Sequence, residues 1–289
     1  MGKVTAFFRL TRIEHSIMLV FAVIAAELIA KGLPSIPILA LSLITPIFIS
    51  MASFAINDYF DVESDRLNKR FERPLVSGEL GKSSALGISV VCLLIGIGAS
   101  VFINLNAFAI ALIFGILAVL YSYKLKDMLL LGNLYIGLSM AIPFLFGNFV
   151  VSQSINYGIL VILFISFLSG TAREIHGMIR DYKGDSKARK SKNLVAYVTR
   201  GRAAQIAFIL YLEAVILSVF LFFFAHPFRF NITYIIPIGI ADVMLMYTAV
   251  ACLFSDDRRT YKMIRNVSLA AMGIAILGYL LAPLLSITI

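Results

Sequence analysis

The chain is poor in charge, in cysteine and in histidine for its length. Charged residues occupy 14% of the 289 positions and hydrophobic residues 60%, a balance that excludes an ordinary soluble domain. The two cysteines, Cys92 and Cys252, lie inside apolar runs, where neither spacing nor context predicts a disulfide or a metal site. No Gly-rich phosphate loop, catalytic triad or nucleic-acid-binding module is present in the sequence. The long apolar runs are therefore the main source of information.

Apolar runs long enough to cross a bilayer recur along the whole chain. We predict an all-α polytopic membrane protein, a bundle of nine transmembrane helices with cytoplasmic cap loops, in a single domain over residues 1–289. The predicted spans are 14–31, 37–60, 84–103, 106–123, 130–150, 156–179, 203–225, 232–254 and 265–286.

The basic residues are distributed unevenly between the predicted spans. With nine spans, 23 of the 25 Lys and Arg residues fall on the side of the N-terminus, and only Lys31 and Arg229 fall on the other. Connections rich in Lys and Arg stay in the cytoplasm. The sequence therefore predicts a multi-pass protein of the cell membrane with a cytoplasmic N-terminus, cytoplasmic charged connections and an outer C-terminus.

An acidic cluster stands at the end of the second predicted span, in the stretch 57–78, NDYFDVESDRLNKRFERPLVSG. On a helix, Asp58, Asp61 and Asp65 fall at i, i+3 and i+7 and share one face. Like charges on one face repel each other unless a cation lies between them, and Mg²⁺ prefers carboxylate oxygens, waters and phosphate oxygens. Taken alone, the stretch also fits a solvated charged loop at the end of a membrane helix.

A second acidic cluster follows the sixth predicted span, on the same side of the membrane. There Glu174, Asp181 and Asp185 fall at i, i+7 and i+11, again on one helical face. Carboxylates alone could bind calcium or protons, and basic residues alone could bind anionic lipid head groups. Both together favour a diphosphate carried with Mg²⁺, and the apolar helices could house an attached hydrocarbon chain. We predict that the two clusters are halves of one site.

These motifs resemble those of the UbiA superfamily of intramembrane prenyltransferases. The resemblance rests on the Asn-Asp-x-x-Asp-x-x-x-Asp pattern of 57–65, the Asp-x-x-x-Asp pattern of 181–185 and the Tyr-Ser-x-x-Leu-Lys pattern of 121–126. It covers nearly the whole chain. Within the superfamily, the segments 73–78 and 173–185 are most similar to those of archaeal digeranylgeranylglyceryl phosphate synthases.

The resemblance implies an enzyme that uses Mg²⁺. It would transfer a geranylgeranyl group from geranylgeranyl diphosphate to the hydroxyl of geranylgeranylglyceryl phosphate, a step of archaeal ether-lipid synthesis. The implied metal ligands are Asn57, Asp61, Asp65, Asp181 and Asp185. The implied catalytic residues are Asp58, Asp61, Asp65, Asp181 and Asp185, with Glu174 as a helper in removing the acceptor proton.

Basic and aromatic residues near the motifs are candidates for substrate binding. Arginine binds phosphate oxygens through its planar fork, lysine acts as a point charge, and tyrosine faces can shield an allylic cation. An acceptor that carries its own phosphate needs a second anion site. The candidates for the diphosphate are Arg70, Arg73, Lys124 and Lys126, and those for the cation are Tyr121 and Tyr123. The candidates for the second anion site are Arg12, Arg173 and Arg180. The expected partners are the donor, the acceptor and the lipid bilayer, without nucleic acid or an obligate protein partner.

Two other functions remain open from the sequence. One is transfer to an aromatic acceptor such as 4-hydroxybenzoate, as in quinone-pathway members of the superfamily. The other is transport of an anionic lipid or metabolite. Transporters place their substrate near the bilayer midplane on broken helices, whereas these acidic clusters gather at one membrane face and only Glu213 and Asp242 lie deep in predicted spans. This one-sided arrangement favours an enzyme.

Overall fold

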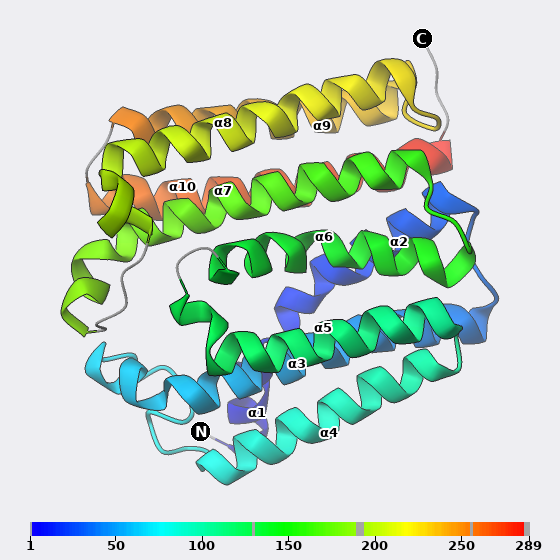
Figure 1. Ribbon diagram of the computed structural model, residues 1–289. Helices are drawn as coiled ribbons and strands as arrows, with labels where there is room; N and C mark the ends of the chain where they lie inside the picture. Colours follow the sequence, from blue (N-terminus) through cyan, green and yellow to red (C-terminus); the bar gives the residue numbers. More distant parts are fainter. Residues whose placement is uncertain (1, 129–130, 189–193, 255–256, 286–289) are drawn as a thin grey trace. The chain divides into compact units, whose positions relative to one another are not determined.

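A computed structural model describes residues 2–128, 131–188, 194–254 and 257–285, without the side chains of residues 181–188, 195, 196 and 258. Every regular element in these ranges is helical, as Figure 1 shows. The α-helices are α1 (Lys3–Thr11), α2 (Ser16–Ala30), α3 (Ile36–Leu67), α4 (Lys82–Val101), α5 (Leu105–Tyr123), α6 (Leu131–Val151), α7 (Tyr157–Ala188), α8 (Leu194–Phe224), α9 (Ile232–Phe254) and α10 (Arg258–Leu285). Two short 3₁₀ turns accompany them, η1 (Ile13–His15) and η2 (Leu125–Asp127).

Nine helical segments within the described residues are long and apolar enough to cross a membrane. They are Lys3–Ala30, Ile36–Leu67, Lys82–Val101, Leu105–Tyr123, Leu131–Val151, Tyr157–Arg180, Tyr197–Phe224, Ile232–Phe254 and Arg259–Leu285. The prediction of an all-α multi-pass membrane protein is therefore confirmed. The prediction of one domain over the whole chain stays a prediction, because the helices group into two compact units, which are described separately.

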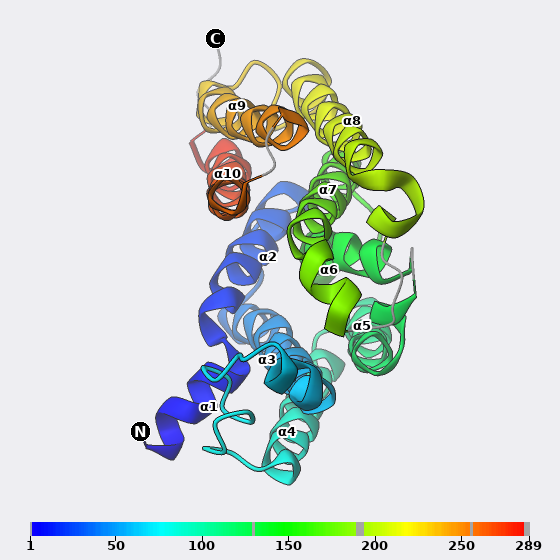
Figure 2. The same cartoon turned by 90° about the vertical axis from the view of Figure 1, so that its left-hand side faces the viewer.

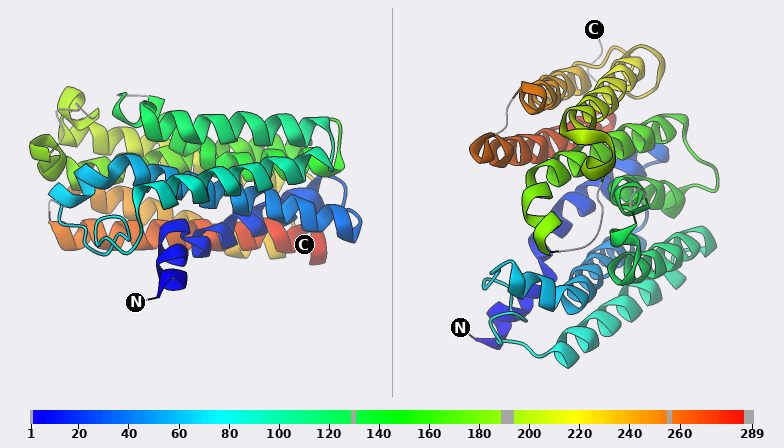
Figure 3. Two further views of the ribbon diagram at one scale, coloured as in Figure 1. Left: turned by 90° about the horizontal axis from the view of Figure 1, so that it is seen from below. Right: turned by 60° about the vertical axis from the view of Figure 1, so that its left-hand side comes forward.

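Unit 1 comprises residues 1–20, 34–126 and 184–190. In it α3, α4 and α5 lie side by side (Figure 1), and small residues let their backbones approach. A side chain on Gly96 of α4 would come within 3.0 Å of the Thr45 carbonyl oxygen of α3, and the Ser89 hydroxyl donates to the Ala52 carbonyl at 2.9 Å. The short α1, blue in Figure 3, runs across the direction of α3 and contacts it.

Unit 2 comprises residues 21–33, 127–183 and 191–289. Here α9 packs against both α8 and α10, as the yellow, orange and red helices of Figure 2 show. Its core includes Ile159, Leu221, Phe228 and Tyr234, each almost fully buried. Helices α6 and α7 meet at Gly137, where an added Cβ would lie 2.9 Å from the Phe167 carbonyl oxygen. This tight contact fixes the rotation of α7, and with it the direction of its polar residues.

Three helices extend beyond the predicted membrane spans. Helix α3 continues beyond residue 60 to Leu67, and α7 continues beyond residue 179 to Ala188, so both acidic motifs are helical. The predicted ends followed hydropathy, but ion pairs on the helix surface, such as Glu63 with Arg66 at i and i+3, support a helix where apolar residues stop. Helix α8 begins at Leu194 rather than 203, with a non-helical kink at Thr199.

Gly96 and Gly98 of α4 provide a matched test of the packing in unit 1. Gly96→Ala should lower the free energy of unfolding by about 1–3 kcal/mol, because its Cβ would overlap α3. Gly98→Ala should be neutral or stabilise by up to about 1 kcal/mol, because nothing lies within 4 Å of that Cβ and alanine favours helix. Thermal unfolding in detergent measures both. Equal melting temperatures for the two variants would contradict the α3–α4 contact.

Candidate functional site in unit 1

The acidic motif lies on one face of α3, as the sequence predicts. The side chains of Asp58 and Asp65 are almost fully buried, with 1% and 4% exposed, and that of Asp61 is 14% exposed. A buried carboxylate is costly unless charged or hydrogen-bonding groups compensate it. The basic partners of these three side chains therefore define the site.

Asp58 is held by two arginines from different segments. Its Oδ1 atom accepts a hydrogen bond from Arg12 Nη2 at 2.7 Å and another from Arg73 Nη1. Arg12 follows α1, while Arg73 lies in the segment of residues 68–81 that joins α3 to α4. The Arg12 guanidinium also lies over the ring of Phe54 on α3, 4.7 Å from its centroid. One buried carboxylate thus connects α1, α3 and the 68–81 segment.

The backbone at Arg12 is bent to bring its side chain to Asp58. Arg12 has φ 47° and ψ 47°, a left-handed conformation that costs a non-glycine residue about 1–2 kcal/mol. Its amide N–H donates to the Phe8 carbonyl at 2.9 Å and so ends α1. The ion pair with Asp58 and the hydrogen bond to Phe8 together offset the strain.

Asp65 and Asp61 also have basic partners. Arg70 Nη1 lies 3.1 Å from Asp65 Oδ1, and Arg73 Nε lies 3.9 Å from Asp65 Oδ2, so Arg73 links two of the aspartates. Lys126, in η2, places its Nζ 2.7 Å from Asp61 Oδ1.

Arg70, Arg73 and Lys126, the predicted contacts of the donor diphosphate, thus lie at the first acidic motif, and their roles stay predictions. Arg12, a candidate for the second anion site, lies at the first motif instead, on Asp58.

The 68–81 segment is fixed to the rest of unit 1 at further points. Arg9 of α1 donates from Nη1 to both carboxylate oxygens of Glu79, at 3.0 and 3.1 Å, and from Nη2 to the Glu72 carbonyl. This hydrogen bonding to Arg9 lowers the pKa of Glu79. Leu75 is buried in an apolar cluster that contains Leu10 of α1. The apolar contact and the ion pairs together position Arg70 and Arg73.

The donor set of this face fits a hard divalent cation. Mg²⁺ takes oxygen ligands and is held by one or two carboxylates, with waters and substrate phosphates completing its shell. Asp61 and Asp65 offer such oxygens, beside basic groups suited to phosphate. Asp58 is less suited to ligate a metal, because two guanidiniums already compensate its charge. Within the described residues no group of three or more His, Cys, Asp or Glu side chains forms a complete protein cage for a metal ion.

For the remaining candidates of the first site, the structure gives mainly the exposure of the side chains. Asn57 is half-buried on α3. Lys124 is exposed, and Tyr123 is 64% exposed with its ring 5.6 Å from that of Phe60. Tyr121 is half-buried. Their predicted contacts with the donor stay predictions.

The second acidic motif is only partly described. Helix α7 runs through Asp181 and Asp185, which confirms that the motif is helical. The side chains of both residues lie outside the described part of the chain. The prediction that the two motifs share one metal site stays a prediction.

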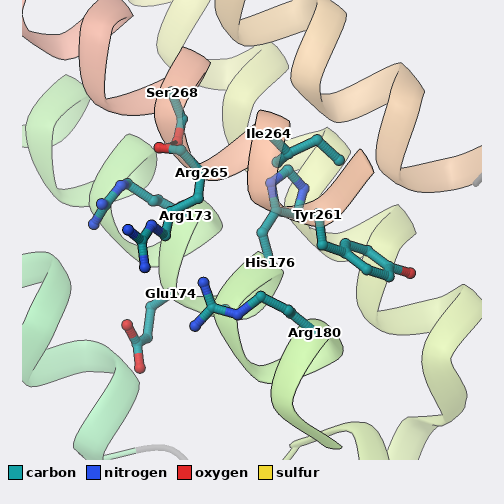
Figure 4. A pocket seen from close by; sticks show the side chains of 9 residues that line it. Arg173, Glu174, His176, Arg180, Tyr261, Ile264, Arg265 and Ser268 are labelled. Atoms are coloured by element: carbon teal, nitrogen blue, oxygen red, sulfur yellow. Dashed lines mark hydrogen bonds between the residues drawn. The ribbon is translucent and has the colours of Figure 1, made fainter. Parts of the chain in front are cut away.

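Other candidates line a pocket between α7 and α10 of unit 2, shown in Figure 4. Arg173, Glu174 and Arg180 come from α7. The sequence predicts Arg173 and Arg180 for the acceptor phosphate and Glu174 as a helper base, and these roles stay predictions. The pocket also contains residues that the sequence analysis did not select, namely His176, Gly177, Tyr261, Ile264, Arg265 and Ser268. In the sequence, Arg265 is one of the 23 basic residues that fall on the side of the N-terminus. The spacing of Tyr261, Arg265 and Ser268 at i, i+4 and i+7 was the available signal that they share a face.

Asp242, one of the two acidic residues deep in predicted spans, has a local partner. Its Oδ2 accepts a hydrogen bond of 2.6 Å from the Ser218 hydroxyl of α8. The Tyr234 hydroxyl donates to the Ser218 carbonyl at 2.9 Å. These contacts join α8 to α9 and support a structural role for Asp242.

Known proteins resemble nearly the whole chain. The profile of the UbiA prenyltransferase family matches residues 18–285. A digeranylgeranylglyceryl phosphate synthase of Archaeoglobus fulgidus is 35% identical over 275 residues, covering 95% of this chain and 94% of that protein. One from Sulfurisphaera tokodaii is 32% identical over 278 residues, covering 95% of this chain and 97% of that protein.

Solved structures also share the fold. A structure of digeranylgeranylglyceryl phosphate synthase superposes with a TM-score of 0.78 at 28% identity, covering 98% of this chain and 99% of the other. A UbiA homologue of A. fulgidus, bound to GPP and Mg²⁺, has a TM-score of 0.66 at 21% identity and covers 94% of this chain and 99% of the other. At that identity the second similarity concerns the fold alone.

The buried position of Asp58 leads to a stability prediction. Asp58→Asn should lower the free energy of unfolding by about 3 kcal/mol, because Arg12 and Arg73 would lose the charge that both of them bind. Glu63→Gln on the same helix is the control, because its pair with Arg66 is exposed and should contribute less than about 1 kcal/mol. Chemical denaturation in detergent measures the difference. Similar losses in both variants would contradict an organising role for Asp58.

Proposed function

Because the chain belongs to the UbiA prenyltransferase family, we propose that it transfers a geranylgeranyl group from geranylgeranyl diphosphate to the hydroxyl of geranylgeranylglyceryl phosphate. The product is digeranylgeranylglyceryl phosphate, which carries two ether-linked chains. The observation that carries the proposal is the acidic face of α3 with its ring of basic partners, in a chain that aligns almost end to end with named synthases of this product.

The first step breaks the allylic C–O bond of the donor. Arg70 and Arg73 present guanidinium N–H groups to the diphosphate oxygens, and Lys126 adds a point charge beside Asp61. Asp61 and Asp65 would hold Mg²⁺, which when bound would supply further positive charge to the leaving group. Interactions that strengthen as negative charge develops on the diphosphate lower the barrier to ionisation.

Asp58 acts on this step through its arginines. Its carboxylate receives Arg12 and Arg73 from two segments and holds their guanidiniums beside Asp61 and Asp65. We therefore assign Asp58 a positioning role, and we assign metal binding to Asp61 and Asp65, with Asn57, Asp181 and Asp185 as further ligands.

The second step forms the ether bond. The acceptor hydroxyl attacks the allylic carbon, its proton leaves, and diphosphate is released. Tyr121 and Tyr123 are the proposed aromatic shield of the cation. Glu174 is the proposed acceptor of the proton, although attack on a carbocation places little demand on a base.

The same enzyme has a proposed orientation in the membrane. Of the 25 Lys and Arg residues, 23 fall on one side when the nine spans alternate, which supports a cytoplasmic N-terminus and cytoplasmic acidic motifs. The diphosphate head group of the donor would then lie on the cytoplasmic side, and the released diphosphate would leave into the cytoplasm. Membership of a prenyltransferase family favours this enzyme over the transporter considered from the sequence.

An acceptor panel tests the proposed reaction. Purified protein with Mg²⁺ and radiolabelled geranylgeranyl diphosphate should convert geranylgeranylglyceryl phosphate to a double-chain ether lipid, measured by thin-layer chromatography. Addition of EDTA should stop the reaction, and added Mg²⁺ should restore it. Transfer only to 4-hydroxybenzoate or another phenol would overturn the lipid-synthase assignment while leaving the family unchanged.

Substitutions of the aspartates test the site. Asp61→Ala and Asp181→Ala should each reduce kcat by about 100-fold or more, because preorganised charge stabilisation in the transition state would be lost. Glu63→Ala is the control on α3, because Glu63 is exposed and pairs only with exposed Arg66 among the described contacts. Full activity in either aspartate variant would remove that residue from the proposed metal site, provided that circular dichroism shows equal helix content.

A further inference from the structure

Three arginines from two helices converge on the pocket in unit 2. Arg173 and Arg180 lie seven residues apart on one face of α7, and Arg265 approaches from α10. Figure 4 shows the guanidiniums of Arg173 and Arg265 close together and that of Arg180 directed to the same opening. Since like charges repel, this convergence favours a bound anion.

The charge of the pocket defines the class of anion. Glu174 is the only carboxylate in the described part of the lining, where three guanidiniums and one carboxylate sum to two positive charges. The Arg173 Nε–H is buried without a hydrogen-bond acceptor in the described structure, and a buried donor without a partner is costly. A phosphomonoester carries close to two negative charges at pH 7 and several acceptor oxygens. Its charge would balance that of the pocket, and one of its oxygens would accept a hydrogen bond from Arg173 Nε–H.

The other lining groups also fit a phosphate. Ser268 brings a hydroxyl group to the lining, and Tyr261 and Ile264 add the walls of the pocket. The Tyr261 hydroxyl itself accepts a hydrogen bond from Arg200 Nε and points away from the three arginines (Figure 4). The pocket has a volume of about 90 Å³. This space is large enough for a phosphate group.

The pocket differs from the acidic face of α3 in its number of carboxylates, the ligands that a metal such as Mg²⁺ requires. Asp61 and Asp65 offer two carboxylates suited to a metal in unit 1, whereas the described lining of the α7–α10 pocket has one carboxylate and three arginines. Mg²⁺ carried with a diphosphate needs carboxylate oxygens. The pocket is therefore suited to a phosphate that binds without a metal.

We propose that Arg173, Arg180 and Arg265 bind the phosphate group of the lipid acceptor, with Arg265 as a specificity residue that the sequence motifs do not reveal. This inference rests on the proposed function, because it takes the acceptor to be a phosphomonoester. Binding the phosphate here orients the acceptor and distinguishes it from phenols and from uncharged glycerol ethers.

Arg265→Gln tests the proposal with two acceptors. With geranylgeranylglyceryl phosphate, its KM for the acceptor should rise by about 10- to 100-fold, the loss expected for a charge-assisted hydrogen bond. Its KM for geranylgeranyl diphosphate should not change. With the phosphate-free analogue geranylgeranylglycerol, the variant and the wild type should have equal kcat/KM. Arg265→Lys should recover part of the affinity.

Arg259→Gln is the matched control. Arg259 is an exposed arginine on the same helix and does not line the pocket, so its acceptor KM should equal that of the wild type. Arg173→Gln should repeat the effect of Arg265→Gln from α7. An unchanged acceptor KM in both pocket variants would overturn the proposal, as would an equal loss with the phosphate-free analogue.

A binding measurement separates this proposal from the proposed function. Inorganic phosphate should raise the melting temperature of the wild type and of Arg259→Gln, and should do so much less in Arg265→Gln. If the wild type prenylates only phenols, the proposed function and the acceptor assignment both fail, even when this phosphate effect persists. If it prenylates the lipid phosphate while phosphate protects all variants equally and KM is unchanged, only the pocket assignment fails.

Discussion

The buried carboxylate of Asp58 is the constraint on which the geometry of unit 1 depends. An ionised group with 1% of its side chain exposed requires compensating charge, and here the compensation comes from two arginines in separate segments. Meeting this requirement brings the end of α1 and the 68–81 segment onto α3. It also explains why Arg12 adopts a left-handed backbone conformation: a helical Arg12 would continue α1 instead of turning at its end.

The same compensation prepares the site for a polyanion. Arg70, Arg73 and Lys126 each contact a carboxylate and carry further N–H donors, so a diphosphate could be received without assembling new basic residues. The apolar contact of Leu75 and the pair of Arg9 with Glu79 hold the segment that carries two of these residues. Preorganisation of this kind reduces the conformational entropy that binding must overcome.

Much of the fold follows from the sequence because hydropathy and helical period are strong, local signals. The nine spans and the shared face of Asp58, Asp61 and Asp65 are of this kind. The pairing of Arg12 with Asp58 is not, because it joins residues 46 positions apart through a bend that no propensity encodes. Arg265 was missed for a related reason: next to a membrane span, an arginine that serves topology and one that serves a pocket look alike.

Arginines occur both at the acidic face of α3 and in the α7–α10 pocket, and the two sites are proposed to bind different anions. Arginine binds any phosphate, so arginine alone cannot distinguish a diphosphate from a phosphomonoester. The number of carboxylates beside the arginines can distinguish the two anions. Carboxylates repel a phosphate without a metal and attract one that is bound to Mg²⁺. Asp61 and Asp65 on α3, against Glu174 as the one carboxylate in the described lining of the α7–α10 pocket, are the basis for the proposed division of the two anions. A prenyltransferase with two phosphorylated lipid substrates needs this distinction, since exchanging the substrates would place a group that cannot leave at the site of ionisation.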